Sequence, residues 1–199
     1  TGMVNMDAKE VLKLYFGYDS FKPGQEETTQ AILGGKDVLA VMPTGSGKSI
    51  CYQVPAMLLS GITIVISPLI SLMQDQVTTL NEAGIHAGYI NSSLTEAQIS
   101  KVYARALEGI YKILYVAPER LESYEFTNFA RKVEISMVTV DEAHCISQWG
   151  QDFRPSYLKI VDFIDGLRKR PVVSAFTATA TEEVKTDISC VLKLQNPKV

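Results

Sequence analysis

Short, mostly apolar segments alternate with longer amphipathic segments along most of this chain. The apolar segments are rich in β-branched residues, which is typical of strands buried in a parallel sheet. The amphipathic segments have the apolar periodicity of helices that pack on a sheet. The pattern predicts strands at residues 36–42, 61–67, 87–90, 111–116, 134–140 and 171–176. It predicts helices at residues 8–16, 23–33, 49–59, 71–83, 95–108, 119–132, 157–167 and 181–192.

This alternation predicts an α/β fold with a mostly parallel central sheet and helices on both of its faces. The chain has 199 residues, of which 46% are hydrophobic, so it can bury the core of one ordinary domain. Neither an internal repeat nor a linker divides it. We therefore expect a single domain over residues 1–199, with a flexible tail at residues 1–7.

One uncharged stretch, residues 49–74, is long enough to span a bilayer. Pro55, Gly61 and Pro68 divide it into three pieces, which match the end of a helix, a buried strand and the start of another helix. We therefore expect no membrane-spanning segment.

The formal net charge is −3, so any contact with nucleic acid must come from local geometry and not from an overall basic field. The cysteines, Cys51, Cys145 and Cys190, lie far apart and form no C-x-x-C motif. This spacing argues against a disulfide framework or a zinc site and fits a reducing, cytosolic compartment. We interpret the basic run at residues 168–170 as the solvated end of a helix rather than a DNA-binding patch.

A glycine-containing loop joins the first predicted strand to the helix after it. The apolar run ends at Pro43, and the sequence MPTGSGKS then leads into the helix. This is the arrangement in which backbone N–H groups and a helix N-terminus bind phosphates, a lysine reaches the β- and γ-phosphates, and a hydroxyl holds Mg²⁺. The usual pattern has glycine where this chain has Met42, and a chance Gly-Lys-Ser in a surface loop is the alternative. The residues expected to bind phosphate are Thr44, Gly45, Ser46, Gly47, Lys48 and Ser49.

An acidic pair, Asp141 and Glu142, follows the apolar strand predicted at residues 134–140. In an open α/β sheet the carboxyl ends of the strands face the ligand crevice. Asp141 is expected to hold Mg²⁺ together with Ser49, and Glu142 to orient and deprotonate an attacking water. The alternative is a solvated helix N-terminus, where acidic residues are common.

With these two motifs in place, the chain resembles a superfamily 2 helicase, and further segments narrow the resemblance to the RecQ family. FGYDSFKPGQEE resembles the family's motif 0, and CISQWGQDFRP its aromatic-rich loop. SPLISLMQDQV, APERL and FTATAT resemble motifs Ia, Ib and III. The resemblance implies a RecA-like P-loop NTPase domain, the first motor domain of an ATP-dependent 3′-to-5′ DNA helicase, with ATP and Mg²⁺ as cofactors.

The resemblance also assigns an adenine site. It implies that Gln25 hydrogen-bonds the adenine edge and that Tyr18 and Lys22 flank the ring. The family usually has arginine at the position of Lys22, and lysine lacks its planar stacking surface. Without the family resemblance, the alternatives are that Tyr18 belongs to the core and that Gln25 is only a polar residue at a helix start.

The aromatic-rich loop is implied to sense single-stranded DNA through Trp149, Phe153 and Arg154, since aromatic rings and guanidinium groups stack on bases of any sequence. A hydrophobic plug beneath a loop is the alternative for a single tryptophan. The family usually has histidine where Gln151 stands.

Five further residues are implied to link the two sites or to contact DNA. His144 is expected to connect the ATP site to Thr177 and Thr179, although a histidine beside carboxylates could be purely structural. Ser67 and Ser71 are expected to place a helix N-terminus near the DNA backbone, where N–H and hydroxyl contacts are independent of sequence. A buried turn would use the same residues.

The implied function is the coupling of ATP hydrolysis to translocation on single-stranded DNA and unwinding of partial duplexes in repair and recombination. Such a motor needs a second RecA-like domain of the same parent protein for its arginine finger, and motifs IV to VI are not in this sequence. We therefore expect the chain alone to bind nucleotide with little turnover. An RNA helicase domain is the other alternative. The implied location is the cytoplasm and nucleoid in a bacterium, or the nucleus in a eukaryote.

Overall fold

A parallel sheet of six strands forms the centre of the molecule. The computed structural model describes residues 6–43, 47–178, 180–195 and 197. Within them the strand order is β1-β6-β5-β2-β4-β3, and each neighbouring pair is parallel. The strands are β1 (Val38–Val41), β2 (Ile62–Ile66), β3 (Ala87–Ile90), β4 (Ile113–Val116), β5 (Ile135–Val140) and β6 (Val172–Thr177).

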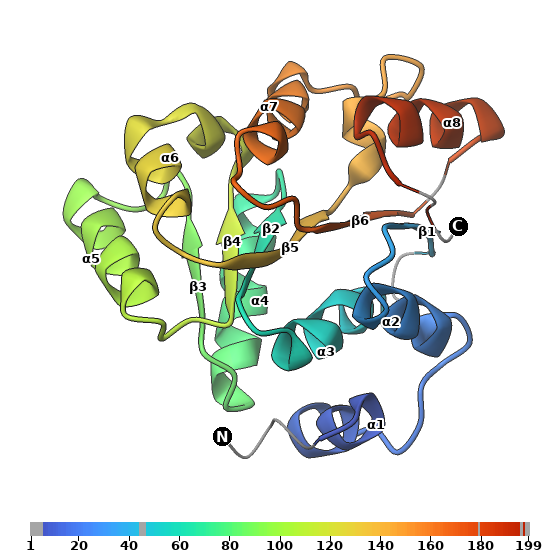
Figure 1. Ribbon diagram of the computed structural model, residues 1–199, viewed down its shortest axis with the longest axis horizontal. Coiled ribbons are helices and arrows are strands. Elements are labelled where there is room, and N and C mark those ends of the chain that lie inside the picture. The colour runs from blue at the N-terminus through green and yellow to red at the C-terminus, as the bar shows by residue number, and fades with distance from the viewer. Residues whose placement is uncertain (1–5, 44–46, 179, 196, 198–199) are drawn as a thin grey trace.

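Helices cover both faces of this sheet and bury a separate hydrophobic cluster on each (Figure 1). One face carries α1 (Ala8–Val11), α2 (Gln25–Leu33), α3 (Ile50–Leu58) and α4 (Ile70–Glu82). The other carries α5 (Glu96–Leu107), α6 (Tyr124–Ala130), α7 (Lys159–Asp165) and α8 (Glu182–Val191). The predicted fold class is confirmed. In the part of the chain described, the longest helices fall short of what a membrane crossing requires.

Local capping explains where the helices differ from the predicted ranges. The segment predicted as one helix at residues 119–132 is a 3₁₀ turn, Pro118–Glu122, followed by α6. Ser123 separates the two because its hydroxyl accepts a hydrogen bond from Phe126 N at 3.2 Å, which makes it the N-cap of α6. Residues 8–16 likewise divide into α1 and a π-helix, Leu12–Phe16, which ends at Gly17 with φ +75°.

The last two residues of the tail predicted at residues 1–7 contact the rest of the domain. Residues 1–5 lie outside the described part of the chain. Met6 packs against the hydrophobic cluster on the α3 face, and Asp7 caps α1 in a reciprocal capping box with Glu10.

The basic run at residues 168–170 is predicted from the sequence to be solvated, and for its last residue this prediction is wrong. Arg170 makes a two-pronged ion pair with the buried carboxylate of Asp37, at 3.1 and 2.7 Å. The same carboxylate accepts hydrogen bonds from Val173 N and Gln195 N. Asp37 therefore joins the starts of β1 and β6 to the segment that follows α8.

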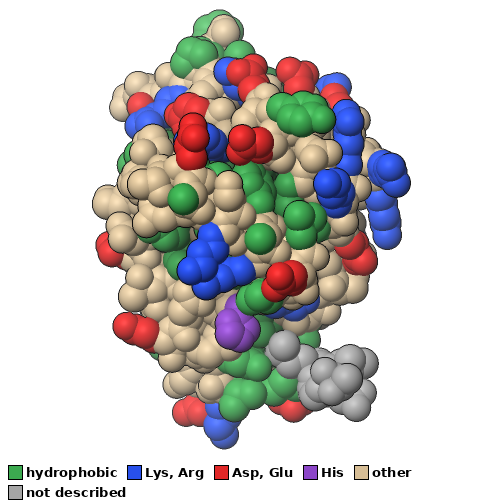
Figure 2. Space-filling model, turned by 90° about the vertical axis from the view of Figure 1, so that its left-hand side faces the viewer, with side chains coloured by type: hydrophobic (Ala, Val, Ile, Leu, Met, Phe, Trp, Pro, Cys, Tyr) green, Lys and Arg blue, Asp and Glu red, His purple; other side chains and the backbone are tan. Residues whose placement is uncertain are grey.

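One face of the molecule agrees with the small net charge. Figure 2 shows the side at the left of Figure 1, where the basic, acidic and hydrophobic side chains of the described residues are interspersed.

Candidate functional site

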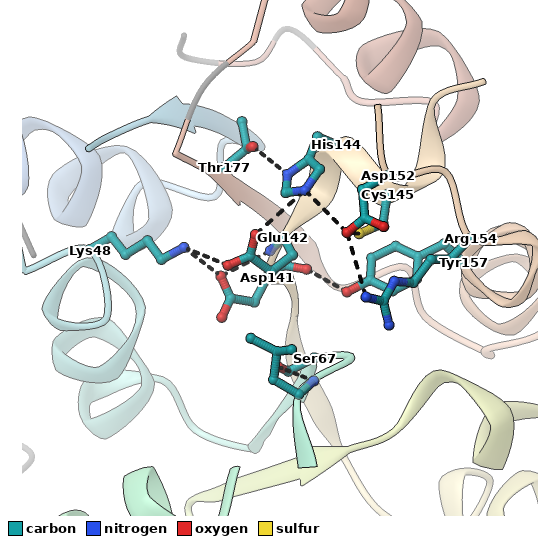
Figure 3. A network of polar contacts seen from close by, with 11 residues as sticks. Lys48, Ser67, Asp141, Glu142, His144, Cys145, Asp152, Arg154, Tyr157 and Thr177 are labelled. Carbon is teal, nitrogen blue, oxygen red and sulfur yellow. Dashed lines mark hydrogen bonds and ion pairs between the residues drawn. The ribbon is translucent and has the colours of Figure 1, made fainter. Parts of the chain in front are cut away.

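The candidate site lies where β1, β6 and β5 end at the same edge of the sheet. These strands are neighbours in that order, and all three are parallel. Lys48 follows β1, Asp141 and Glu142 follow β5, and Thr177 ends β6. The topology thus brings together motifs that are far apart in the sequence, at the edge where open α/β sheets bind ligands (Figure 3).

The Lys48 ammonium group contacts both carboxylates of the acidic pair. Its Nζ lies 3.1 Å from Asp141 Oδ1 and 3.3 Å from Glu142 Oε1. Burial alone would lower the pKa of Lys48, but the two carboxylates outweigh burial and the pKa is raised. The side chain of Asp141 is only 8% exposed, and this burial raises its pKa. Attraction to Lys48 lowers the pKa of Asp141 but does not cancel the effect of burial. The solvated-helix alternative for the pair is therefore excluded.

Glu142 holds a strained backbone conformation. Its φ of +52° and ψ of +46° fall in the left-handed region, and its N–H donates to Asp141 Oδ1 at 3.0 Å. Such a conformation in a residue with a side chain costs about 1–3 kcal/mol and is concentrated at functional sites. It directs the carboxylate of Glu142 between Lys48 and His144, whose Nε2 lies 3.6 Å from Glu142 Oε2.

His144 connects the acidic pair to β6. Its Nδ1 lies 2.7 Å from Thr177 Oγ1, so the contact expected between these two residues is present. Thr179, the other residue expected there, is outside the described residues. On the opposite side Asp152 Oδ2 lies 4.0 Å from His144 Nε2 and 3.5 Å from Arg154 Nη2. A polar network therefore runs from Lys48 to the aromatic-rich segment (Figure 3).

Tyr157 is part of this site, although the sequence analysis assigned it only to the predicted helix at residues 157–167. Its side chain is fully buried, and its hydroxyl donates to the backbone carbonyl of Asp141 at 2.7 Å. Asp141 N in turn donates to Ile66 O at 2.9 Å. The turn after β5 is therefore held from two sides. A tyrosine on an apolar helix face resembles any core residue, so no sequence signal marks it.

The aromatic-rich segment exposes its tryptophan. Trp149 is 68% exposed, which excludes the hydrophobic-plug alternative. Phe153 is half-buried, and the backbone N–H of Arg154 donates to Cys145 O at 2.8 Å, which ties the end of the segment to the turn after β5. A cleft of about 530 Å³ separates the segment from the start of α8. It is lined by His144, Trp149, Gly150, Gln151, Asp152, Ala180, Thr181 and Val184.

Gln25 is hydrogen-bonded to the backbone of the glycine-containing loop that follows β1. Its Nε2 donates to Gly47 O at 2.9 Å, and its Oε1 accepts from Lys22 N at 2.8 Å. Among the described residues these two bonds use one N–H and one lone pair of the amide, and Gln25 is buried. Gly47 has φ +78°, and a Cβ there would lie 2.5 Å from Gln25 Nε2, so only glycine fits. Tyr18 is 52% exposed and does not belong to the core.

The donor set of this edge fits a magnesium nucleotide. Tyr18, Gly47 and Ser49 line one cavity of about 370 Å³ with Gln53 and Gln76. Ser49 is the N-cap of α3, and its neighbour Lys48 reaches Asp141. A hydroxyl and a carboxylate are oxygen ligands of the kind Mg²⁺ prefers. Thr44, Gly45 and Ser46 are outside the described residues.

The two serines expected near DNA differ in accessibility. Ser67 is buried, and its hydroxyl accepts a hydrogen bond from Leu69 N at 3.4 Å, which is the buried-turn alternative. Ser71 is exposed in the first turn of α4. Only Ser71 therefore presents a hydroxyl at the surface.

Comparison with known proteins places these features in a family context. The family model for the DEAD/DEAH box helicases matches residues 22–187. The ATP-dependent DNA helicase RecQ of Bacillus subtilis is 50% identical over 189 residues, which cover 94% of this chain and 32% of that protein. The RecQ of Haemophilus influenzae is 47% identical, over 95% of this chain and 30% of that protein. The chain thus spans about a third of the length of these relatives.

Solved structures show the same fold. The DUF1998 helicase MrfA bound to DNA and AMPPNP has a TM-score of 0.75 at 18% identity, covering 100% of this chain and 29% of that chain. The Pyrococcus furiosus Hef helicase domain has a TM-score of 0.67 at 19% identity, covering 87% of this chain and 36% of that chain. The predicted RecA-like architecture is confirmed.

Proposed function

Because the chain belongs to the DEAD/DEAH box helicase family, and its relatives at 45–50% identity include proteins named ATP-dependent DNA helicase RecQ, we propose that it is the ATP-binding motor domain of a RecQ-type 3′-to-5′ DNA helicase. The observation that carries this proposal is the contact of Lys48 with both Asp141 and Glu142. It joins the phosphate loop and the acidic pair into one site.

In the proposed reaction a water attacks the γ-phosphorus of ATP, the bond to the β-phosphate oxygen breaks, and the water proton passes to Glu142. Lys48 exchanges its contacts with the carboxylates for the β- and γ-phosphate oxygens. Mg²⁺, held by Ser49 and Asp141, would neutralise the charge on those oxygens. Gln25 binds the adenine edge with its remaining N–H and lone pair, and Tyr18 and Lys22 flank the ring.

In the proposed coupling, DNA reaches the chemistry through His144. Trp149, Phe153 and Arg154 would stack on or pair with single-stranded DNA. Movement of that segment would act on Asp152 and His144, and through them on Glu142 and Thr177. Ser71 would contact the DNA backbone, and the buried Ser67 would shape the turn that presents it.

We propose that the parent protein supplies the arginine finger from a second RecA-like domain. The contacts of Lys48 with two carboxylates support the second candidate for the isolated chain, a nucleotide-binding module with little turnover, since this lysine must be redirected before it acts on phosphate.

The test compares nucleotide binding with hydrolysis. We expect the chain to bind a fluorescent ATP analogue in the presence of Mg²⁺, and Lys48→Ala to weaken binding, with the exposed Lys36→Ala as the matched control. In the longer parent, Glu142→Gln should lower DNA-stimulated hydrolysis by about 10²–10⁴-fold, the usual contribution of a general base, while binding persists. Normal turnover in Glu142→Gln would refute the assigned base. Strong DNA stimulation in the chain alone would refute the binding-module candidate.

A further inference from the structure

A histidine, a cysteine and an aspartate converge on the side of Glu142 away from Lys48 (Figure 3). One side-chain donor atom from each of His144, Cys145 and Asp152 lies within 4.8 Å of the other two. Asp152 Oδ2 is 4.0 Å from His144 Nε2 and 3.8 Å from Cys145 Sγ. Glu142 Oε2 is 3.6 Å from the same His144 Nε2.

These separations suit one tetrahedral ion. Zinc bonds of about 2.0 Å to nitrogen and oxygen and about 2.3 Å to sulfur place neighbouring tetrahedral ligands roughly 3.3–3.8 Å apart. The contacts of 3.6, 3.8 and 4.0 Å fall within or just above that range. A thiolate, an imidazole and a carboxylate are also the ligand types that zinc combines. Small side-chain shifts would therefore complete the coordination.

The histidine is already oriented for such a role. Its Nδ1 contacts Thr177 Oγ1 at 2.7 Å, which leaves Nε2 directed at the two carboxylates. Metal-binding histidines are commonly held in this way by a partner on their other ring nitrogen.

An ion can reach the cluster from solvent. His144 and Asp152 line the cleft of about 530 Å³ beside Trp149. The Asp152 side chain is 56% exposed, whereas Cys145 is fully buried and forms the inner end of the cluster. Arg154 is the competing partner of Asp152, at 3.5 Å with 40% of its side chain exposed, so it can turn away into solvent.

We propose that His144, Cys145 and Asp152 form a binding site for one Zn²⁺ ion, with Glu142 or a water as fourth ligand, and that the Cys145 thiol releases its proton to solvent on binding. The ion would fix the aromatic-rich segment against the acidic pair. On the proposed function, this would inhibit DNA-stimulated ATP hydrolysis reversibly. The binding itself does not depend on that function.

The test uses the chain freed of metal by a chelator and titrated with Co²⁺ as a spectroscopic substitute for Zn²⁺. We expect one equivalent to give the absorption of tetrahedral cobalt with a near-ultraviolet thiolate-to-cobalt band, and Zn²⁺ to displace it. Cys145→Ser should lose that band, whereas Cys190→Ser, which removes the exposed cysteine, should keep it. Absence of the band from the wild type, or its survival in Cys145→Ser, would overturn the proposal.

A second variant covers the case in which Cys145→Ser does not fold. Asp152→Asn changes a half-exposed side chain and should weaken Zn²⁺ binding by at least about tenfold. Even the loss of a residue that only hydrogen-bonds a metal ligand lowers affinity by about that factor. Thr177→Val should weaken it by about 10–100-fold. If both variants bound Zn²⁺ with the affinity of the wild type, the cluster would be a hydrogen-bond network and not a metal site. Zinc binding without any nucleotide binding would refute the proposed function and leave the metal site standing.

Discussion

Tyr157 donates its hydroxyl to the backbone carbonyl of Asp141 across 2.7 Å, and both residues are buried. The bond ties the segment before α7 to the residue proposed to hold Mg²⁺. It therefore makes a core tyrosine a positioning residue for the acidic pair.

Tyr157→Phe should destabilise the chain by about 1–3 kcal/mol, because the Asp141 carbonyl would lose a buried hydrogen bond without gaining water. Urea unfolding measures this change. Tyr124→Phe is the matched control, since Tyr124 is 82% exposed and its loss of a hydroxyl should be nearly neutral. Equal stability of the two variants would show that the bond to Asp141 contributes nothing.

Asp141 should give stability an unusual pH dependence. Burial raises its pKa above the ordinary value of 3.8. Its contribution to stability is therefore fully present below that value and is lost as pH rises through the raised pKa. The unfolding free energy of the wild type relative to Asp141→Asn should fall as pH rises from about 4 upward. In a Lys48→Met background the fall should be larger, because Lys48 holds the pKa of Asp141 down. A difference that does not change with pH would contradict this.

Glu142 offers a direct test of backbone strain. Glu142→Gly and Glu142→Ala remove the same carboxylate, but only glycine adopts φ +52° without strain. The glycine variant should be more stable by about 1–2 kcal/mol, the cost of a left-handed conformation with a Cβ. Thermal or urea unfolding of the pair decides it. An alanine variant as stable as the glycine variant would show that the conformation is not retained without the glutamate.

The Asp37–Arg170 pair should contribute strongly to stability. Arg170→Met leaves a 2%-exposed carboxylate without its cation and should cost about 3 kcal/mol, the low end for breaking a buried pair, because the arginine side chain is 30% exposed. Arg168→Met, at an exposed neighbour, should change stability by less than about 0.5 kcal/mol. Adding Asp37→Asn to Arg170→Met should recover part of the loss. If the double variant lost as much stability as the two single variants together, coupling between Asp37 and Arg170 would be ruled out.

The strands and most helices could be predicted from the sequence because each depends on a local pattern. Short apolar runs predicted the six strands of the sheet, and Thr95 with Gln98 predicted the capping box that starts α5. The proximity of Lys48 to Asp141 could also be anticipated, since parallel strands end at one edge of a sheet. The spacing of the cysteines argues only against a zinc site built from cysteine pairs. A site that combines one cysteine with a histidine and an aspartate leaves no such spacing signal in the sequence.

By itself the sequence determined the fold class and the places of the glycine-containing loop and the acidic pair at strand ends, because hydrophobic periodicity, glycine positions and strand ends are properties of neighbouring residues. Only the tertiary structure decided the strand order, the bond from Tyr157 to Asp141, and the pairing of Arg170 with Asp37 across 133 positions. It also decided that His144 and Asp152 face each other beside Cys145. These contacts depend on how helices and turns pack across the sheet, and no local pattern encodes the distance between side chains on different elements.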